Sequence, residues 1–382
     1  MILGHCIALS PNKTQMNHLS QCCGVARFAY NWALGQWNDH WEAQKALKKE
    51  DRGYISEGDL RKHFNEIKRD KFPWAMEVTK YAPQEAIKNL GNAFNEFFNG
   101  KAKYPRFKKK FVNDRFSIGN DQVKVEGKYV RLPKVGWIKM HEAVRFDGAI
   151  KLITVSRKAD KWFISFAIDV EDHTRYYKQT ENQGVVAGLD VGLKHLAILS
   201  NGETFDNPRT LKKNLKKMRL LQRSLSRRKK GSNRRKKMKL RIAKLHQKIS
   251  NIRNDGLHKM TTTLSQRFGV VVVETLNVKG MLKNRRLSQS VSDASFFEIK
   301  RQLRYKMPLR GGRLVEADTF FPSSKLCSTC GWKNVELQLK DRKWKCQKCG
   351  TTHDRDINAA MNLKNLAASM VVADDTSVKV HG

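Results

Sequence analysis

The sequence predicts a multidomain α+β protein, and three features carry this prediction. In the first hundred residues, apolar side chains recur at three- and four-residue steps, which indicates helices. From residue 101 the pattern changes to short alternating segments bounded by Gly and Pro, which indicates strands. Two Cys-x-x-Cys pairs near the C-terminus indicate a small metal-binding module. A chain of 382 residues is long enough for two to four such structural units.

The N-terminal part is predicted to be a β domain that contains a helical insertion. One strand is expected at 2–9, and helices follow it, the last of them from Tyr81 to Phe98. Because the remaining strands come after these helices, we assign 1–10 and 101–180 to a β-barrel domain and 11–100 to a helical domain. The later strands are expected at 129–132, 137–140, 150–157 and 162–170.

A third domain is assigned to residues 181–325 and 351–370, and the segment 326–350 is inserted into it. The β-branched run at 270–273 is typical of a strand buried on both faces. Residues 371–382 are expected to form a disordered tail. Further strands are predicted at 185–190, 196–200 and 313–318, and helices at 292–307 and from about 354 to 370.

The charge of the chain points to a polyanionic partner. Lys and Arg number 75 against 36 Asp and Glu, a formal net charge of +39. Such an excess repels itself in the folded state unless a polyanion offsets it, and nucleic acid is the obvious candidate. A basic membrane-surface protein would be the rival, but no apolar run of 18 residues and no signal-peptide pattern occurs. We therefore expect a soluble, cytoplasmic protein.

The positive charge is concentrated in residues 207–253, which contain twenty Lys or Arg and no Asp or Glu. Apolar residues keep helical spacing through this segment, and Gly231-Ser232-Asn233 is the predicted turn between two helices. Twenty unopposed cations exceed what solubility requires, so contacts to phosphates are expected. The candidate contact residues are Lys212, Lys216, Arg227, Arg228, Arg234 and Arg235.

The two cysteine pairs have the spacing of a closed zinc site. Cys327 and Cys330 are separated by fifteen residues from Cys346 and Cys349, which suits two knuckles around one tetrahedral ion. Four cysteine ligands leave no open position, so this zinc is structural. The other three cysteines, Cys6, Cys22 and Cys23, are expected to be small buried apolar residues.

Three acidic residues stand at the ends of regular elements in the third domain. Asp190 and Glu274 close apolar strands, and Asp356 lies at the start of the last helix. Phosphodiester hydrolysis with two Mg²⁺ ions needs a carboxylate cluster of this kind. Taken alone, however, an Asp shortly before a Gly, as in Asp190-Val191-Gly192, is more often a turn residue.

Asp354 also precedes the last helix, and helical geometry separates it from Asp356. Asp356 lies on the same stripe as Ala360 and Leu363, which must pack against the sheet. Asp354 lies two residues earlier, and is expected to be the N-cap that accepts the N–H of Ile357.

Almost the whole chain resembles the TnpB proteins of bacterial and archaeal insertion sequences, which resemble ancestors of the type V CRISPR effector nucleases. The final block is the most specific part of the resemblance. The matching segments are Arg27-Phe-Ala-Tyr-Asn-Trp-Ala-Leu34, Tyr104-Pro-Arg-Phe-Lys108, Gly188-Leu-Asp-Val-Gly-Leu-Lys194, Val273-Glu-Thr-Leu-Asn-Val-Lys-Gly-Met281, Ser324-Lys-Leu-Cys-Ser-Thr-Cys-Gly331 and Cys346-Gln-Lys-Cys-Gly-Thr-Thr-His-Asp-Arg-Asp-Ile-Asn-Ala-Ala360.

The resemblance implies an RNase H-like (RuvC) nuclease core with an inserted zinc ribbon, an N-terminal β-barrel (wedge) domain and a helical recognition domain within it. It implies that Asp190, Glu274 and Asp356 hold two Mg²⁺ or Mn²⁺ ions and cut double-stranded DNA. It also implies a guide RNA from the transposon end and a short motif beside the target. Further candidate contacts to nucleic acid are Lys80 and Gln84, in the helix where the family reads this motif, and Arg106 and Arg355.

Two other functions fit the same residues. One is a protein-guided nuclease or transposase with the same RNase H-like core, which needs the three acids but no RNA. The other is a zinc-ribbon DNA-binding regulator without catalysis, whose function would survive the loss of Asp190.

Overall fold

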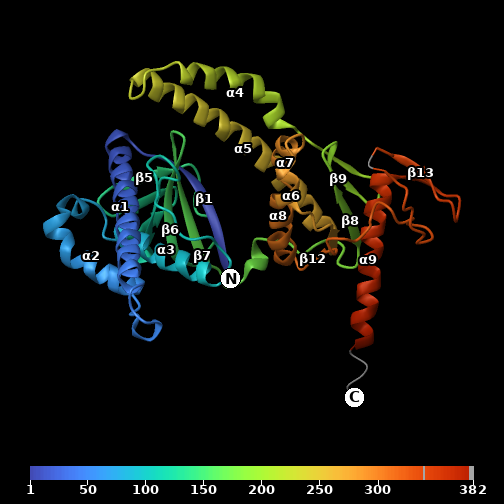
Figure 1. The fold of residues 1–382 in the computed structure, drawn as a ribbon, viewed down its shortest axis with the longest axis horizontal. Coiled ribbons are helices and arrows are strands. Elements are labelled where there is room, and N and C mark those ends of the chain that lie inside the picture. Colours follow the sequence, from blue (N-terminus) through green and yellow to red (C-terminus); the bar gives the residue numbers. More distant parts are fainter. Residues whose placement is uncertain (339, 378–382) are drawn as a thin grey trace. The chain divides into compact units, whose positions relative to one another are not determined.

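A computed structural model describes residues 1–338 and 340–377 (Figure 1). The chain divides into two compact units, Met1–Asp172 and His173–Gly382, and each is described by itself. Within the described residues, no helix is both long and apolar enough to cross a membrane.

The first unit is built on a seven-stranded antiparallel sheet. Its strand order is β2-β6-β7-β1-β5-β4-β3, and no pairing among the described residues joins β2 to β3. Strands β2 and β3 were not predicted from the sequence. The strands are β1 (Ile2–Ser10), β2 (Arg115–Gly119), β3 (Lys124–Glu126), β4 (Tyr129–Leu132), β5 (Gly136–Met140), β6 (Ala149–Lys158) and β7 (Lys161–Asp169).

Three α-helices separate β1 from β2, namely α1 (Lys13–Gln44), α2 (Glu57–Lys71) and α3 (Tyr81–Phe98). The helix α1 begins at a capping box in which Asn12 and Gln15 exchange side-chain and backbone hydrogen bonds. Helices α1 and α3 pack together, and the rings of Trp37 and Phe94 stack with centroids 3.9 Å apart.

The three isolated cysteines lie in this unit, and one of them differs from expectation. Cys22 and Cys23 are buried in α1, and burial raises the pKa of each thiol to about 12. Cys6 is exposed, because side chains alternate along β1 and its neighbour Ile7 takes the buried side.

The second unit is built on a mixed five-stranded sheet with the order β10-β9-β8-β11-β12. Strands β8, β11 and β12 are parallel, and β9 and β10 are antiparallel to their neighbours. From β8 the chain continues to β9 on one side, and β11 lies on the other, so the strand order reverses between β8 and β11. The strands are β8 (Val186–Val191), β9 (His195–Leu199), β10 (Thr204–Asp206), β11 (Val270–Val273) and β12 (Arg313–Glu316).

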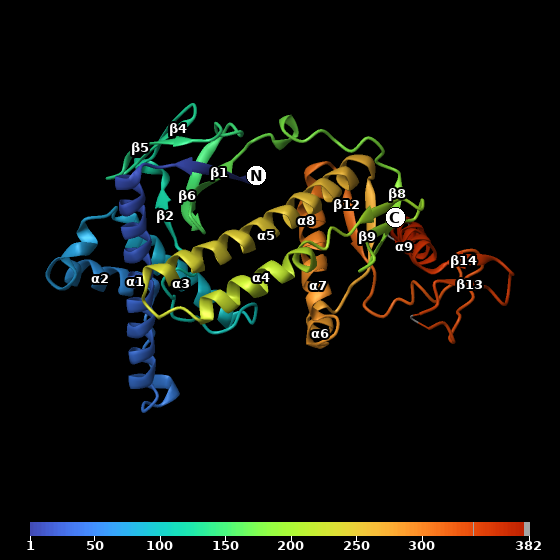
Figure 2. The ribbon, with the colours of Figure 1, turned by 90° about the horizontal axis from the view of Figure 1, so that it is seen from above.

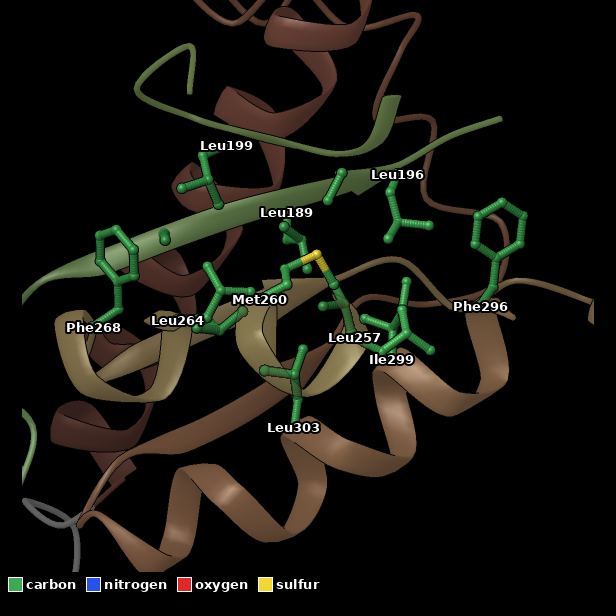
Figure 3. Packing of buried hydrophobic residues seen from close by; sticks show 14 of the residues in the cluster. Leu189, Leu196, Leu199, Leu257, Met260, Leu264, Phe268, Phe296, Ile299 and Leu303 are labelled. Atoms are coloured by element: carbon green, nitrogen blue, oxygen red, sulfur yellow. The ribbon is translucent and has the colours of Figure 1, made fainter. Parts of the chain in front are cut away.

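Helices cover both faces of this sheet. Figure 3 shows Leu189 and Leu199 packed against Leu264 of α5 (Asn233–Arg267) and Leu303 of α8 (Phe296–Leu309). On the other face, Val272 packs with the last helix, α9 (Arg355–Ser377). The strand at 270–273 is therefore buried on both faces, as its β-branched sequence predicts.

The basic segment forms a helical hairpin from α4 (Thr210–Ser226) and α5, which lie side by side (Figure 2). Its small core consists of Met218, Leu245 and Ile249. At the start of α4, the buried carboxylate of Asp293 accepts the backbone N–H of Leu211 at 3.0 Å.

Two helix boundaries differ from the sequence prediction. The expected helix at 292–307 is two helices, α7 (Ser288–Ala294) and α8, because Ser295 adopts the left-handed conformation with φ 55°. The last helix extends to Ser377, so residues 371–377 belong to it and not to a disordered tail. Residues 378–382 of that expected tail lie outside the described residues.

Candidate metal centres

Two of the three candidate acids come together at the point where the strand order reverses. Asp190 is the next-to-last residue of β8, and Glu274 directly follows β11; the two strands are paired with Val273 opposite Leu189. Because side chains alternate, Asp190 lies on the same face as Gly188, and Glu274 on the same face as Val272. This is the face that α9 covers, at the carboxyl ends of parallel strands, where open α/β sheets bind ligands.

Gly188 lets α9 approach the sheet closely enough to complete the cluster. A Cβ atom at this position would lie 1.8 Å from the carbonyl oxygen of Ala360. Any side chain larger than hydrogen would therefore push α9 away, and Asp356 in its first turn would move with it. A glycine inside a strand is a sequence signal of such a close approach, and Gly188 could have been singled out by it.

The electrostatics show that the three carboxylates share one environment. Burial, followed by the nearby charges of Glu274 and Asp356, raises the pKa of Asp190 well above its usual range. Burial also raises the pKa of Glu274 to about 7, against a smaller effect of the Val191 backbone N–H. Clustered carboxylates that repel one another are a suitable ligand set for hard divalent cations.

Asp356 also contacts the inserted segment. The Nη1 of Arg342 donates to both carboxylate oxygens of Asp356, at 3.1 and 3.0 Å. The backbone joins the same two segments, since the N–H of Arg355 donates to the carbonyl of Arg342 at 2.8 Å. Nothing in the sequence pattern singled out Arg342, because it is one of several cations between the two cysteine pairs.

Asp354 has the capping role that the sequence predicts. Its Oδ1 accepts the backbone N–H of Ile357 at 3.2 Å and that of Asp356 at 3.0 Å. The stripe that follows Asp356 is fully buried, with Ala360, Leu363 and Ala367 each 0% exposed. Of the two acids, Asp356 is therefore the one directed at the sheet.

The four cysteines of the two pairs form one cluster. All four Sγ atoms lie within 4.8 Å of one another, and the Cys327–Cys349 and Cys330–Cys346 pairs are each 3.6 Å apart. Tetrahedral zinc with Zn–S bonds of about 2.3 Å needs sulfur atoms about 3.8 Å apart. The cluster therefore fits one structural zinc ion. Trp344 packs beside it as core.

Side chains near and on α9 hold this cluster next to the carboxylates. His353 Nε2 lies 3.0 Å from the sulfur of Cys327. Asn358 accepts the Ser328 N–H at 2.9 Å and donates to the Leu326 carbonyl at 2.6 Å, and it is 2% exposed. These contacts were not predicted, although a His four residues after a Cys-x-x-Cys pair is a recognisable signal.

The other candidate contacts do not form one site. Arg235 donates to the carbonyls of Leu225 and Arg228, at 2.7 and 2.9 Å, and so closes the turn between α4 and α5. Arg355 lies near the carboxylates and lowers the pKa of both Asp190 and Glu274, against the stronger effect of burial. Lys80, Arg106, Lys212, Lys216, Arg227 and Arg234 are exposed, while Gln84, Arg228, Arg235 and Arg355 are half-buried.

Three family models match the chain. One described as "Probable transposase" covers residues 163–285, and one described as "Cas12f1-like, TNB domain" covers 296–363. A third, described as "Helix-turn-helix domain", covers 1–46, where the structure has β1 and the single long helix α1.

Relatives match over nearly the full length. "Putative RNA-guided DNA endonuclease InsQ" of Escherichia coli (strain K12) is 33% identical, covering 95% of this chain and 91% of the relative. A "Putative RNA-guided DNA endonuclease" of Streptomyces pristinaespiralis is also 33% identical, over 95% and 88%. A solved Cas12f1-sgRNA-target DNA complex matches the fold with a TM-score of 0.56 at 16% identity, covering 92% of this chain and 82% of that one. The chain belongs to the TnpB family.

Proposed function

We propose that this protein is an RNA-guided DNA endonuclease encoded by an insertion sequence. The observation that carries the proposal is the convergence of Asp190, Glu274 and Asp356 at the carboxyl ends of β8 and β11, where the charges of Glu274 and Asp356, after burial, raise the pKa of Asp190. The printed names of the two relatives support the same activity.

The three carboxylates would hold two Mg²⁺ or Mn²⁺ ions. Oxygen ligands from Asp190, Glu274 and Asp356 fit these hard cations, and the raised pKa values of Asp190 and Glu274 reflect charge that a cation would balance. When bound, two such ions activate water and stabilise charge on the leaving oxygen of the phosphodiester. The role of the chain is to position these carboxylates, since β8, β11 and the start of α9 fix the three side chains.

The fold supports this proposal. The order β10-β9-β8-β11-β12, with antiparallel β9 and β10 added to the parallel strands β8, β11 and β12, supports an RNase H-like (RuvC) core. We assign the core to 181–325 and 351–370, and the zinc ribbon to 326–350. In the first unit, the sheet of 1–10 and 101–180 would be the barrel-like wedge domain, and the helices of 11–100 the recognition domain.

The proposed partners are a guide RNA from the transposon end and double-stranded target DNA with an adjacent motif. The basic α4–α5 hairpin would contact phosphates, and Lys80 with Gln84 at the start of α3 would read the motif, since Gln can address adenine edges. With these partners, the proposed location of the protein is the prokaryotic cytoplasm or nucleoid.

Purification from its host with bound nucleic acid tests the proposal. We expect one RNA species that maps to the transposon end, guided DNA cleavage with Mg²⁺, and no cleavage by Asp190→Ala. Cleavage without RNA would favour a protein-guided nuclease, and full function of Asp190→Ala would favour a non-catalytic regulator.

The basic hairpin has a separate test. If its cations contact phosphates, the logarithm of RNA affinity falls linearly and steeply with the logarithm of salt concentration. Reversing the exposed Lys212, Lys216 and Arg234 to Glu should flatten this slope. An unchanged slope would mean that the cations of the hairpin are only solvated and do not contact phosphates.

A further inference from the structure

A cavity opens beside Glu274 at the carboxyl end of β11. Its volume is about 300 Å³, which suits a small group and not a folded segment. Apart from Glu274, no acidic residue lines it. Its apolar lining comes from the ends of β8 and β11, from the segment that follows β11, and from α8, namely Val191, Val273, Leu276, Val278, Phe296 and Ile299.

An aromatic ring stands at this cavity. Phe296 and Phe297 begin α8, but only Phe296 is buried, at 5% exposure, whereas Phe297 is 61% exposed. Figure 3 shows Phe296 at the end of the apolar cluster, beside Ile299. Phe296 therefore anchors the start of α8 in the core, and this anchor fixes the position of the exposed ring of Phe297.

Cations complete the lining. Lys300 and Arg304 hold the carboxylate of Glu316 between them, at 3.0 and 2.7 Å, so their positions are fixed and one positive charge remains. Lys279 adds an exposed ammonium. The cavity thus combines an apolar wall and an exposed ring with a cationic edge. Val191, Val273 and α8 place it on the face of the sheet opposite α9, and Glu274, at the end of β11, lies at its border.

A second cavity, in the same unit, has a different character. It is lined by Lys194, Arg209, Lys212 and Arg342, and its volume is about 340 Å³. Arg342 also contacts Asp356, so this basic cavity adjoins the carboxylates as well. A strand that crosses the carboxylates would find cations for its phosphates there, but no exposed ring.

We propose that the cavity at Glu274 receives the base of the nucleotide next to the scissile phosphate, stacked on Phe297, while Lys279 contacts the flanking phosphate. This inference rests on the proposed nuclease function and names a subsite for its DNA substrate. Stacking on an aromatic ring accepts any base, because every base has a π-face. Such a subsite orients the strand without adding sequence preference, as an enzyme directed by a guide requires.

The test is a double-mutant-type cycle, in which the protein and the DNA substrate are changed separately and then together. Cleavage rates are measured for the guide-loaded protein on target DNA that carries either a normal or an abasic nucleotide beside the cut. We expect Phe297→Ala to slow cleavage of normal DNA roughly 5- to 100-fold, the range for loss of one stacked base. The abasic nucleotide should slow cleavage by the unaltered protein by a similar factor. The two changes together should slow cleavage no more than either change alone.

Three controls keep the outcome clear. Phe297→Tyr should restore the rate, because it keeps the ring. Phe320→Ala removes another ring, 93% exposed and outside the cavity, and should leave the rate unchanged. Guide RNA binding and thermal unfolding of Phe297→Ala should match those of the unaltered protein.

The possible failures are distinguishable. If the unaltered protein cuts, Asp190→Ala does not, and Phe297→Ala cuts normally, the subsite is refuted and the nuclease stands. If the losses from Phe297→Ala and from the abasic nucleotide multiply, Phe297 does not act through that base, and the subsite is again refuted. If the unaltered protein with its guide cuts no DNA, the proposed function itself fails.

Discussion

The two candidate metal centres of the second unit adjoin each other but are built on opposite principles. The four sulfur ligands come from two short knuckles, and one ion would satisfy them completely. The carboxylates come from β8, the end of β11 and the start of α9; burial raises the pKa of Asp190 and of Glu274, and the charges of Glu274 and Asp356 raise that of Asp190 further. The four-cysteine cluster is thus a closed site, which can stabilise the fold once it holds its ion. The carboxylate cluster is an open site, which lowers the stability of the fold until cations bind.

The largest expected effect separates catalysis from stability at the open site. Asp356→Ala should reduce cleavage more than about a thousandfold, because a ligand needed in the transition state is lost. Guide and target binding should persist, as measured by filter binding or mobility shift. An active Asp356→Ala, with Asp354→Ala inactive, would reverse the assignment of these two acids.

The next effect concerns the closed site. Cys330→Ser should lose zinc and unfold the ribbon, because zinc binding supplies about 10–16 kcal/mol in comparable small modules. Cleavage should fall with it, since Arg342 and the Asn358 contacts connect the ribbon to α9. Metal content and cleavage are measured together, with the exposed Cys6→Ser as the matched control. Full activity of zinc-free protein would contradict the coupling.

A pH titration tests whether the open site costs stability. The pKa of Glu274 rises from an ordinary 4.5 to about 7 on folding. Between these values the folded state keeps a proton that the unfolded state releases, so the free energy of unfolding falls as pH rises. The loss is at most about 3 kcal/mol.

Urea unfolding from pH 5 to 8, without added Mg²⁺ and with zinc retained, should show this decline. Glu274→Gln should make the free energy of unfolding less dependent on pH, and saturating Mg²⁺ should reverse the direction of this dependence. A free energy of unfolding that rises with pH would contradict the idea that the burial of the Glu274 carboxylate costs stability.

The smallest expected effect is that of a substitution at Asp354, which lies in the chain between the cysteine ligands and Asp356. Asp354 ends β14 (Thr352–Asp354) and caps α9, so Asp354→Ala should cost about 1 kcal/mol of stability. Cleavage should remain substantial, and Asp354→Asn should restore most of the stability. A change in melting temperature, followed by circular dichroism, measures both variants.

The same contrast explains how much the sequence predicts. The ribbon was predictable because its ligands are close in the chain and their spacing is distinctive. The strand Val270–Val273 was equally clear from its β-branched run. The boundary at Ser295 was not, because a left-handed serine carries no composition signal.

The geometry of the carboxylate cluster depends on tertiary packing, which local patterns do not encode. Asp190 and Glu274 become neighbours only through the pairing of β8 with β11, and Asp356 through the fit of α9 over Gly188. The contacts of Arg342 with Asp356 and of His353 with Cys327 also depend on how the ribbon packs against α9. The resemblance to a family named the three acids, but it did not explain what holds them together.

The position of α9 at the end of the chain has a consequence for biosynthesis. A ribosome completes β8, β11 and the basic hairpin well before Arg355 and Asp356 emerge. A nascent or prematurely terminated chain therefore contains two of the three acids and nearly all of the cationic surface. If the chain is the nuclease proposed above, such fragments should bind nucleic acid without cutting it, and cleavage should require a chain that extends through Asp356.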